Sequence, residues 1–390
     1  MAWLSRRSRR ILCAALLSAV LLPACTEAYS GREAPEVVNG VLDLSDWDFA
    51  GDGPLPLHGT WALYWNELLS AGDFDSREPR PHSFAKVPAF WSTYSTPNRK
   101  ITSDGYATFH VRLILPQGRP LLSLRLPNQG TAYRLLAGDT LLASNGSVGG
   151  TPESSRGEYR VLYAVLPNER VVDLYMQVSN FQNYRGGFWG SVELGSNSQI
   201  NGYRLRSQST VLFLIGAIAI IGLYHVTMFL YRRKDRAAMW FALICGIIVL
   251  RISLTDERVL QGAFPFVPWV VFFKLEFLSF YAAIPVFAIF VEGLFPKITH
   301  RPLMLGIYWI GGLFCALVAL SPVYVITLTL AYFQVFTLAT IVYGVFVGIR
   351  SCVQRDPDGP LFLLGIVVLL SSTAHDIARS NLPWLNTPFL

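Results

Sequence analysis

Residues 211–236 read VLFLIGAIAIIGLYHVTMFLYRRKDR, in which an uncharged apolar stretch runs directly into a basic cluster. A helix needs about 20 mostly apolar residues to cross a bilayer, and basic residues gather at the cytoplasmic ends of such helices. Similar apolar segments follow after short connections, at 237–254, 270–294, 303–320, 324–349 and 361–378. The pattern therefore predicts an all-α transmembrane helix bundle of six helices over residues 208–380, followed by an extracytoplasmic tail at 381–390.

The composition agrees with a membrane protein, because 52% of the 390 residues are hydrophobic. A net charge of +6 could suggest nucleic acid. We prefer a membrane partner and no nucleic acid, because the basic residues gather in loops beside the apolar segments. The six histidines are scattered without metal-ligand spacing. We find no paired carboxylates, nucleophile elbow or phosphate loop, so we predict no metal, no cofactor and no enzymatic activity.

Residues 1–28 have the three parts of an export signal. A basic region at Arg6 to Arg10 precedes a short apolar run at 11–22, and small residues then offer cleavage sites. Residues 22–25 (LPAC) resemble a bacterial lipobox with Cys25 as the lipid-bearing residue, although proline before the small residue is atypical. Lipidation of Cys25, ordinary cleavage and an uncleaved signal anchor all remain open.

The polar stretch at 35–200 alternates short apolar runs with Gly, Pro, Asn and Asp turns, which is typical of an antiparallel β domain. We expect strands at 106–115, 121–126, 133–137, 140–144, 160–166, 171–178 and 187–194. Strands of this length and spacing favour a jelly roll or β-sandwich. The predicted fold class is therefore a multi-domain membrane protein, with an all-β extracellular domain followed by an all-α transmembrane bundle.

Loops at one end of such a domain are the usual place for a ligand. The β region is rich in aromatic residues, which sugar-binding sandwiches stack on pyranose rings, although aromatics within strands are more often core. Polar and aromatic residues near two loops are the candidate ligand-binding residues: Asn128, Tyr133, Arg134, Asn180, Tyr184, Arg185 and Trp189. For Arg185, contact with the membrane surface is an equal alternative.

Basic residues alternate between successive loops. They follow the first, third and fifth apolar segments, at 232–236, 297–301 and 350–355, and are sparse in the other loops. By the positive-inside rule this places the β domain outside the cell membrane, and an even number of later spans brings the C-terminal end outside as well.

Charged residues inside the apolar segments are costly and therefore informative. Arg251, Glu276 and Asp376 lie at similar depth near the outer ends of their segments. We expect Arg251 and Glu276 to pair and join two helices, with Asp376 as a third coupling candidate. The alternative is that each side chain extends separately to the interface.

The chain resembles the bacterial seven-transmembrane receptors with diverse intracellular signalling modules, and its β region is similar to their type 2 extracellular sensor domain. In the β region the matching stretches are Gly59-Thr60-Trp61, Val87-Pro88, Gly105-Tyr106-Ala107-Thr108, Gly130-Thr131-Ala132-Tyr133-Arg134, Val178-Ser179-Asn180 and Gly186-Gly187-Phe188-Trp189. In the membrane half they are Gly222-Leu223-Tyr224-His225 before Arg232-Arg233-Lys234, and Leu275-Glu276-Phe277-Leu278-Ser279-Phe280-Tyr281.

The resemblance implies a jelly-roll sensor in the bacterial inner membrane. The sensor would bind an extracytoplasmic small molecule, with a carbohydrate among the candidates, and relay the binding signal through its helices. The family has seven helices and usually a cytoplasmic output domain, whereas this sequence has six apolar segments and no output domain. We therefore interpret the sequence as truncated: without an output domain of its own, the chain either needs a cytoplasmic signalling partner or is inert. The alternatives are a membrane-anchored carbohydrate-binding module without signalling and a transporter with an exported cap domain.

Overall fold

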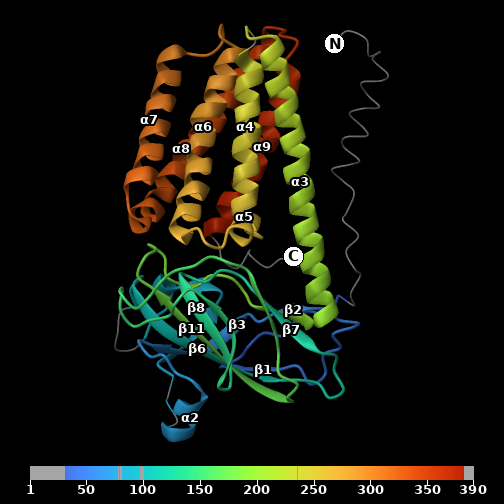
Figure 1. The fold of residues 1–390 in the computed structure, drawn as a ribbon, viewed down its shortest axis with the longest axis vertical. Helices are drawn as coiled ribbons and strands as arrows, with labels where there is room; N and C mark the ends of the chain where they lie inside the picture. Colours follow the sequence, from blue (N-terminus) through green and yellow to red (C-terminus); the bar gives the residue numbers. More distant parts are fainter. Residues whose placement is uncertain (1–30, 78, 80, 97–100, 235, 382–390) are drawn as a thin grey trace.

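The structure is a computed structural model that describes residues 31–77, 79, 81–96, 101–234 and 236–381. The predicted export signal with Cys25 and nearly all of the tail at 381–390 lie outside the described residues. Within them, a β domain at one end of the molecule is followed by a bundle of helices (Figure 1). The predicted order, an all-β domain before an apolar helical bundle, is confirmed.

The β domain contains three sheets. The largest has strand order β4-β3-β6-β11-β8-β9, and β1 pairs with β6 in parallel. Its strands are β1 (Val41–Asp43), β3 (Gly59–Trp65), β4 (Ser83–Val87), β6 (Gly105–Ile114), β8 (Ala132–Ala137), β9 (Thr140–Asn145) and β11 (Val171–Asn180). The second sheet contains β10 (Leu162–Val165), β7 (Leu122–Leu126), β13 (Glu193–Ser196) and β2 (Leu55–Pro56), and a small pair joins β12 (Gly187–Phe188) to β5 (Ala89–Phe90). A short helix, α2 (Ala71–Arg77), follows β3.

One hydrophobic core holds the two larger sheets together. Ala107, Phe109 and Val111 alternate along β6 and are fully buried, as expected for a strand with one face on the core. Leu124 and Leu194 come to the same core from the second sheet. The domain therefore depends on apolar packing, and the free cysteines among the described residues all lie in helices of the bundle.

The prediction of a single strand at 187–194 is wrong, because this stretch contributes to two strands in different sheets. Gly187–Phe188 pairs with β5, whereas Glu193–Ser196 pairs with β2 and β7 in a different sheet. Between them the chain passes against Pro127, so close that a side-chain carbon at Gly190 would lie 2.7 Å from that ring. The crossover places Trp189 between the sheets and the helices.

The helices are α3 (Asn197–Tyr231), α4 (Arg236–Leu254), α5 (Val259–Ala263), α6 (Trp269–Leu294), α7 (Arg301–Leu320), α8 (Val323–Val353) and α9 (Gly359–Asn381). Five of them, α3, α4, α6, α7 and α8, are long and apolar enough to cross a membrane, and the described apolar part of α9 is Gly359–His375. Each predicted apolar segment lies within one of the six long helices. The chain is thus a multi-pass membrane protein.

The first membrane helix begins earlier than its apolar segment, because α3 continues directly from β13. Ser196 caps α3: its hydroxyl accepts from the backbone N–H of Gln199, and the Gln199 side chain accepts from the backbone N–H of Ser196. At 1.5 Å per residue the helix is about 52 Å long, well beyond the roughly 30 Å of a bilayer core. The first turns of α3 therefore lie beyond the bilayer core, on the side of the β domain.

The loops at the two ends of the bundle differ. The α4–α6 connection with α5 and the α7–α8 turn face the β domain, whereas the α3–α4, α6–α7 and α8–α9 loops lie at the far end (Figure 1). These far loops are the ones that carry the predicted basic clusters, at 232–236, 297–301 and 350–355.

Candidate functional site

A cavity of about 290 Å³ lies where the β domain meets α6 and α8. Its β domain side comes from Asn128 in the segment after β7, from Phe90 and Tyr159, and from the loop at 183–185 and the crossover at Trp189. Its other side comes from α6, α8 and the loop before α5. The cavity approaches the lower end of the usual size range for small-molecule sites, and such sites often form between domains.

Four of the seven candidate ligand residues line this cavity: Asn128, Tyr184, Arg185 and Trp189. They come from three separate segments, at Asn128, at 184–185 and at Trp189, which only the folded domain brings together. The backbone N–H of Tyr184 donates to Thr327 Oγ1 of α8 over 3.0 Å, so this loop contacts the bundle directly. The Arg185 guanidinium stacks 4.9 Å from the Phe90 ring and remains on the cavity wall.

The other three candidates lie elsewhere. Tyr133 is fully buried in the core of the sheets, where burial raises its pKa, and its hydroxyl faces the Leu126 carbonyl at 3.4 Å. Arg134 donates to the Gln177 side chain on the neighbouring strand β11. Both positions belong to β8, where alternation places one residue in the core and the next on the outer face. They are therefore not cavity residues.

Asn180 acts on the loop and does not line the cavity. It is fully buried, and its amide donates to the backbone oxygens of Ser103 and Asn183 over 2.8 and 2.7 Å. Its carbonyl oxygen accepts from the backbone N–H of Asn183 at 3.0 Å. At Gly186 an added side-chain carbon would lie 2.3 Å from the Ser103 oxygen, so only glycine permits this close path. Asn180 thus shapes the loop that presents Tyr184 and Arg185.

An ion pair forms the wall of the cavity on the bundle side, but with a different arginine from the predicted one. Glu276 Oε2 accepts from Arg258 Nη1 over 3.0 Å, whereas Arg251 reaches the backbone oxygen of Glu276 at 3.5 Å. The predicted Arg251–Glu276 carboxylate pair is therefore wrong. The reason is local: the Arg251 guanidinium lies 4.7 Å from the Phe280 ring, one turn further along α6. Asp376 has a side chain outside the described residues.

Arg258 precedes α5 in a left-handed backbone conformation, with φ of 49°, and is 9% exposed. The same guanidinium lies 5.0 Å from the Tyr159 ring of the β domain. Arg258 therefore contacts both halves of the molecule at once. The sequence showed it only as the single basic residue of an outer loop.

Tyr159 is the aromatic centre of the contact between the halves. Its ring packs against Trp189 at 5.9 Å, Trp269 at 5.5 Å and Phe273 at 5.9 Å. Its hydroxyl accepts from Asn183 Nδ2 over 3.0 Å, and burial raises its pKa. Sequence reasoning missed Tyr159 and Asn183, because neither stands in a motif and each matters only through its distant neighbours.

A second contact joins the β domain to the base of α3. Arg125 Nη1 donates to Glu193 Oε1 over 2.9 Å, and the Arg125 guanidinium lies 5.0 Å from the Tyr203 ring of α3. Ser207 of α3 donates to Glu257 in the α4–α5 connection at 2.7 Å. Burial raises the pKa of Glu193 to about 7, although the positive charge of Arg125 opposes this shift.

Three polar atoms on residues of the cavity wall are buried without a hydrogen-bond partner among the described residues: Asn128 Oδ1, which is an acceptor, and Trp189 Nε1 and Arg258 Nε, which are donors. A buried polar group without a partner costs about 1–3 kcal/mol. Among the described residues no cluster of three or more His, Cys, Asp or Glu has the arrangement of a metal site. The chemistry of the cavity is thus aromatic and hydrogen-bonding.

Residues 207–390 match the family model described as 7TM diverse intracellular signalling. No curated protein matches the chain. Similar solved structures include a β-glucuronidase from Ruminococcus gnavus, at 13% identity over 36% of this chain and 27% of that chain, with a TM-score of 0.29. They also include a GH2 β-galacturonidase from Eisenbergiella tayi, at 14% identity over 37% of this chain and 24% of that chain, with a TM-score of 0.27.

The chain thus spans about a quarter of the length of those enzymes, and the likeness is too weak to assign an activity. The family match, in contrast, covers every helix of the described bundle except the first turns of α3. Residues 207–390, which form the membrane part of the chain, therefore belong to the 7TM diverse intracellular signalling family.

Proposed function

We propose that this protein is a transmembrane receptor that binds a small polyhydroxylated molecule, such as a sugar, in the cavity between the β domain and the helices. Membership of the 7TM diverse intracellular signalling family and the apolar helices support the receptor role. The observation that carries the binding site is the convergence of Asn128, Tyr184, Arg185 and Trp189 on one cavity whose opposite wall is α6 and α8.

The chemistry of the wall favours hydroxyl groups. A hydroxyl both donates and accepts, so one ligand could satisfy the acceptor on Asn128 and the donor on Arg258. Aromatic rings from Tyr159, Trp189 and Phe273 provide flat apolar faces beside these polar groups. A molecule with C–H faces and hydroxyl edges matches both kinds of surface.

The route of the signal follows from the same contacts. A ligand shifts a conformational equilibrium only when it binds one state better than the other. A ligand between Trp189 and α6 would contact Glu276 and Arg258. Its affinity would therefore depend on how far the sheets of the β domain lie from the helices. We place the β domain outside the cell, because the basic loops lie at the opposite end of the bundle.

The binding test uses the full chain in lipid nanodiscs and three named probes: D-glucose, D-galactose and D-glucuronic acid. A probe at one hundred times its Kd should stabilise the protein by about 2.7 kcal/mol and raise its melting temperature. Arg185→Ala should abolish the shift, and Arg134→Ala is the matched control because Arg134 lies away from the cavity. An equal loss in both variants, or a shift retained in Arg185→Ala, contradicts the site.

A second measurement separates a receptor from a membrane-anchored binding module. Lys297 lies in the α6–α7 loop, just after the 18 residues by which α6 continues beyond Glu276, a length of about 27 Å along the helix. A fluorescent label on Lys297→Cys, with the native cysteines replaced, should change its emission when a bound probe is added. Binding without any change at this far end would support the anchored module.

A further inference from the structure

Glu193 is buried at the point where the β domain continues into the first membrane helix. It is the first residue of β13, and β13 leads through the cap residue Ser196 directly into α3. Its side chain is 1% exposed, because β13 lies between β7 and β2 in the second sheet. Glutamates are almost never buried to this extent unless they are paired. The pairing of Glu193 therefore bears directly on the joint between the two halves of the molecule.

The pairing of Glu193 is incomplete. Its Oε1 accepts from Arg125 Nη1 over 2.9 Å, whereas Oε2 is buried and has no partner among the described residues. Arg125 Nε is likewise buried without a partner in this part of the chain, so the two groups do not form the two-bond pair of which an arginine and a carboxylate are capable. An unpaired buried oxygen costs most when it carries charge. The geometry of the pair thus favours the neutral, protonated carboxyl group.

The surroundings of the pair contain charges from both halves of the molecule. The charged and titratable groups that face Glu193 or its cluster are Arg125 of β7, Tyr163 of β10, Tyr203 and Arg204 of α3, and Asp256 and Glu257 of the α4–α5 connection. The remaining neighbour, β2, pairs with Glu193 through Pro56 and contains no charged residue. The Arg125 guanidinium lies at the centre, because it also stacks 5.0 Å from the Tyr203 ring.

Glu257 brings a second negative charge to this cluster from the bundle. Its Oε1 accepts from Ser207 Oγ over 2.7 Å. Ser207 follows Tyr203 by four residues on α3, so the two side chains lie on one face of the helix in consecutive turns. Nearby carboxylates disfavour each other's charge. A charge on Glu193 therefore acts across the joint, on a group that belongs to the bundle.

We propose that Glu193 is a proton-binding group through which the pH on the β domain side of the membrane sets how the β domain packs against α3 and the α4–α5 connection. With the proton bound, the carboxyl group is neutral and the joint is closed. When the proton passes to bulk water, the carboxylate repels Glu257 and its unpaired oxygen requires hydration. The joint then opens enough for water to reach that oxygen.

The electrostatics of the site agree with its geometry. Burial raises the pKa of Glu193 to about 7, the positive charge of Arg125 opposes this increase, and the negative charge of Glu257 adds to it. An ordinary glutamate is already ionised at neutral pH. Glu193 instead changes its charge around neutrality, so a modest change in external pH alters the charge at the joint.

The α4–α5 connection leads from this site into the bundle. The residue after Glu257 is Arg258, which pairs with Glu276 in the wall of the sensor cavity. Two residues before Glu257, the Thr255 hydroxyl donates to the backbone oxygen of Arg251 over 3.1 Å. A displacement of Glu257 therefore reaches both the ion pair and the outer end of α4.

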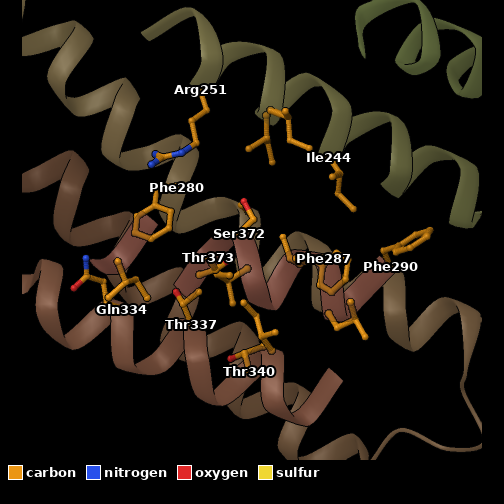
Figure 2. A pocket seen from close by; sticks show the side chains of 18 of the residues that line it. Ile244, Arg251, Phe280, Phe287, Phe290, Gln334, Thr337, Thr340, Ser372 and Thr373 are labelled. Carbon is orange, nitrogen blue, oxygen red and sulfur yellow. The ribbon is translucent and has the colours of Figure 1, made fainter. Parts of the chain in front are cut away.

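The outer part of α4 also lines a second cavity, of about 670 Å³, inside the bundle. Figure 2 shows Arg251 of α4 beside the Phe280 ring of α6 in the wall of this cavity. The residues that line both this cavity and the sensor cavity are Glu276, Phe277, Leu330 and Gln334. A movement that begins at the joint is thus passed to the packing of α4 against α6.

The test measures the distance between the β domain and the bundle in the full chain in lipid nanodiscs. No sugar is present, so the result is independent of the proposed sugar site. Spin labels at Leu141→Cys on β9 and Leu320→Cys at the end of α7, both exposed positions, report this distance by double electron–electron resonance after replacement of the native cysteines. The distance should increase as the pH is raised, with a single midpoint at about pH 7. A distance that does not change with pH overturns the proposal.

Three variants assign the response to Glu193. Glu193→Gln preserves the shape of the neutral side chain and cannot lose the proton, so the distance should keep its low-pH value throughout. Glu153→Gln is the matched control, because Glu153 is exposed in the same domain, and it should respond as the wild type does. Glu257→Gln removes the neighbouring negative charge and should move the midpoint to lower pH. A response retained in Glu193→Gln, or an unchanged midpoint in Glu257→Gln, overturns the proposal.

Infrared difference spectra of the wild type provide a readout that does not require any variant to fold. The C=O stretch of a protonated carboxylic acid should lose intensity as the pH is raised, with the same midpoint as the change in distance. Loss of this band without a change in distance would mean that Glu193 titrates but does not control the joint, and a change in distance with a different midpoint would assign it to another group. Either result overturns the proposal.

Discussion

The ion pair between Arg258 and Glu276 is the contact that should respond most clearly to mutation. At an effective dielectric constant of 20, opposite charges about 4 Å apart attract by about 4 kcal/mol. Removing one partner leaves the other charge buried, which typically costs about 3–5 kcal/mol. The two side chains are 10% and 19% exposed, so solvent screens the pair only in part. We therefore expect Arg258→Gln to destabilise the protein by about 3 kcal/mol.

The assay is a double-mutant cycle in which thermal unfolding of the detergent-solubilised chain is monitored by fluorescence-detected gel filtration. Arg258→Gln and Glu276→Gln should each lower the melting temperature, and the double variant should recover much of the loss because no unpaired charge remains. The same cycle with Arg251→Gln is the control, since the Arg251 guanidinium reaches the backbone oxygen of Glu276, which the Glu276→Gln change leaves in place. A coupling between Arg251 and Glu276 as large as that between Arg258 and Glu276 would refute the reasoning.

Three further predictions concern the joints between the halves. The pKa of Glu193 is raised from 4.5 to about 7, so folding favours its protonated form. The free energy of unfolding should therefore fall as pH rises from about 4.5 to 7. Glu193→Gln should remove this pH dependence from the melting temperature. In Gly130→Ala the new carbon would lie 2.2 Å from the Trp189 ring, so the variant should lose about 1–3 kcal/mol and the sugar-induced melting shift; an unchanged shift would show that Trp189 is not part of the binding wall. Tyr159→Phe removes the acceptor of Asn183 and should cost about 1 kcal/mol in unfolding experiments, and a variant as stable as the wild type would contradict this role.

The ligand residues show how far sequence reasoning reaches. Asn128, Tyr184, Arg185 and Trp189 could be selected because polar and aromatic residues in turns are often exposed and functional. Tyr133 and Asn180 were selected by the same rule, yet one packs in the core and the other shapes a loop. Residue type and turn position do not reveal which way a side chain points once the loops have met.

The sequence by itself determined the two-part architecture, because bilayer thickness demands long apolar segments and strands demand alternation, and both are periodic signals within one segment. It also determined the loops in which basic residues gather. Only the tertiary structure decided the partners: Arg258 instead of Arg251 for Glu276, Tyr159 at the joint, and two cavities with a common wall. The physical reason is distance along the chain. Tyr159 and Glu276 are brought together by the packing of a whole domain on a whole bundle, and no local pattern encodes that contact.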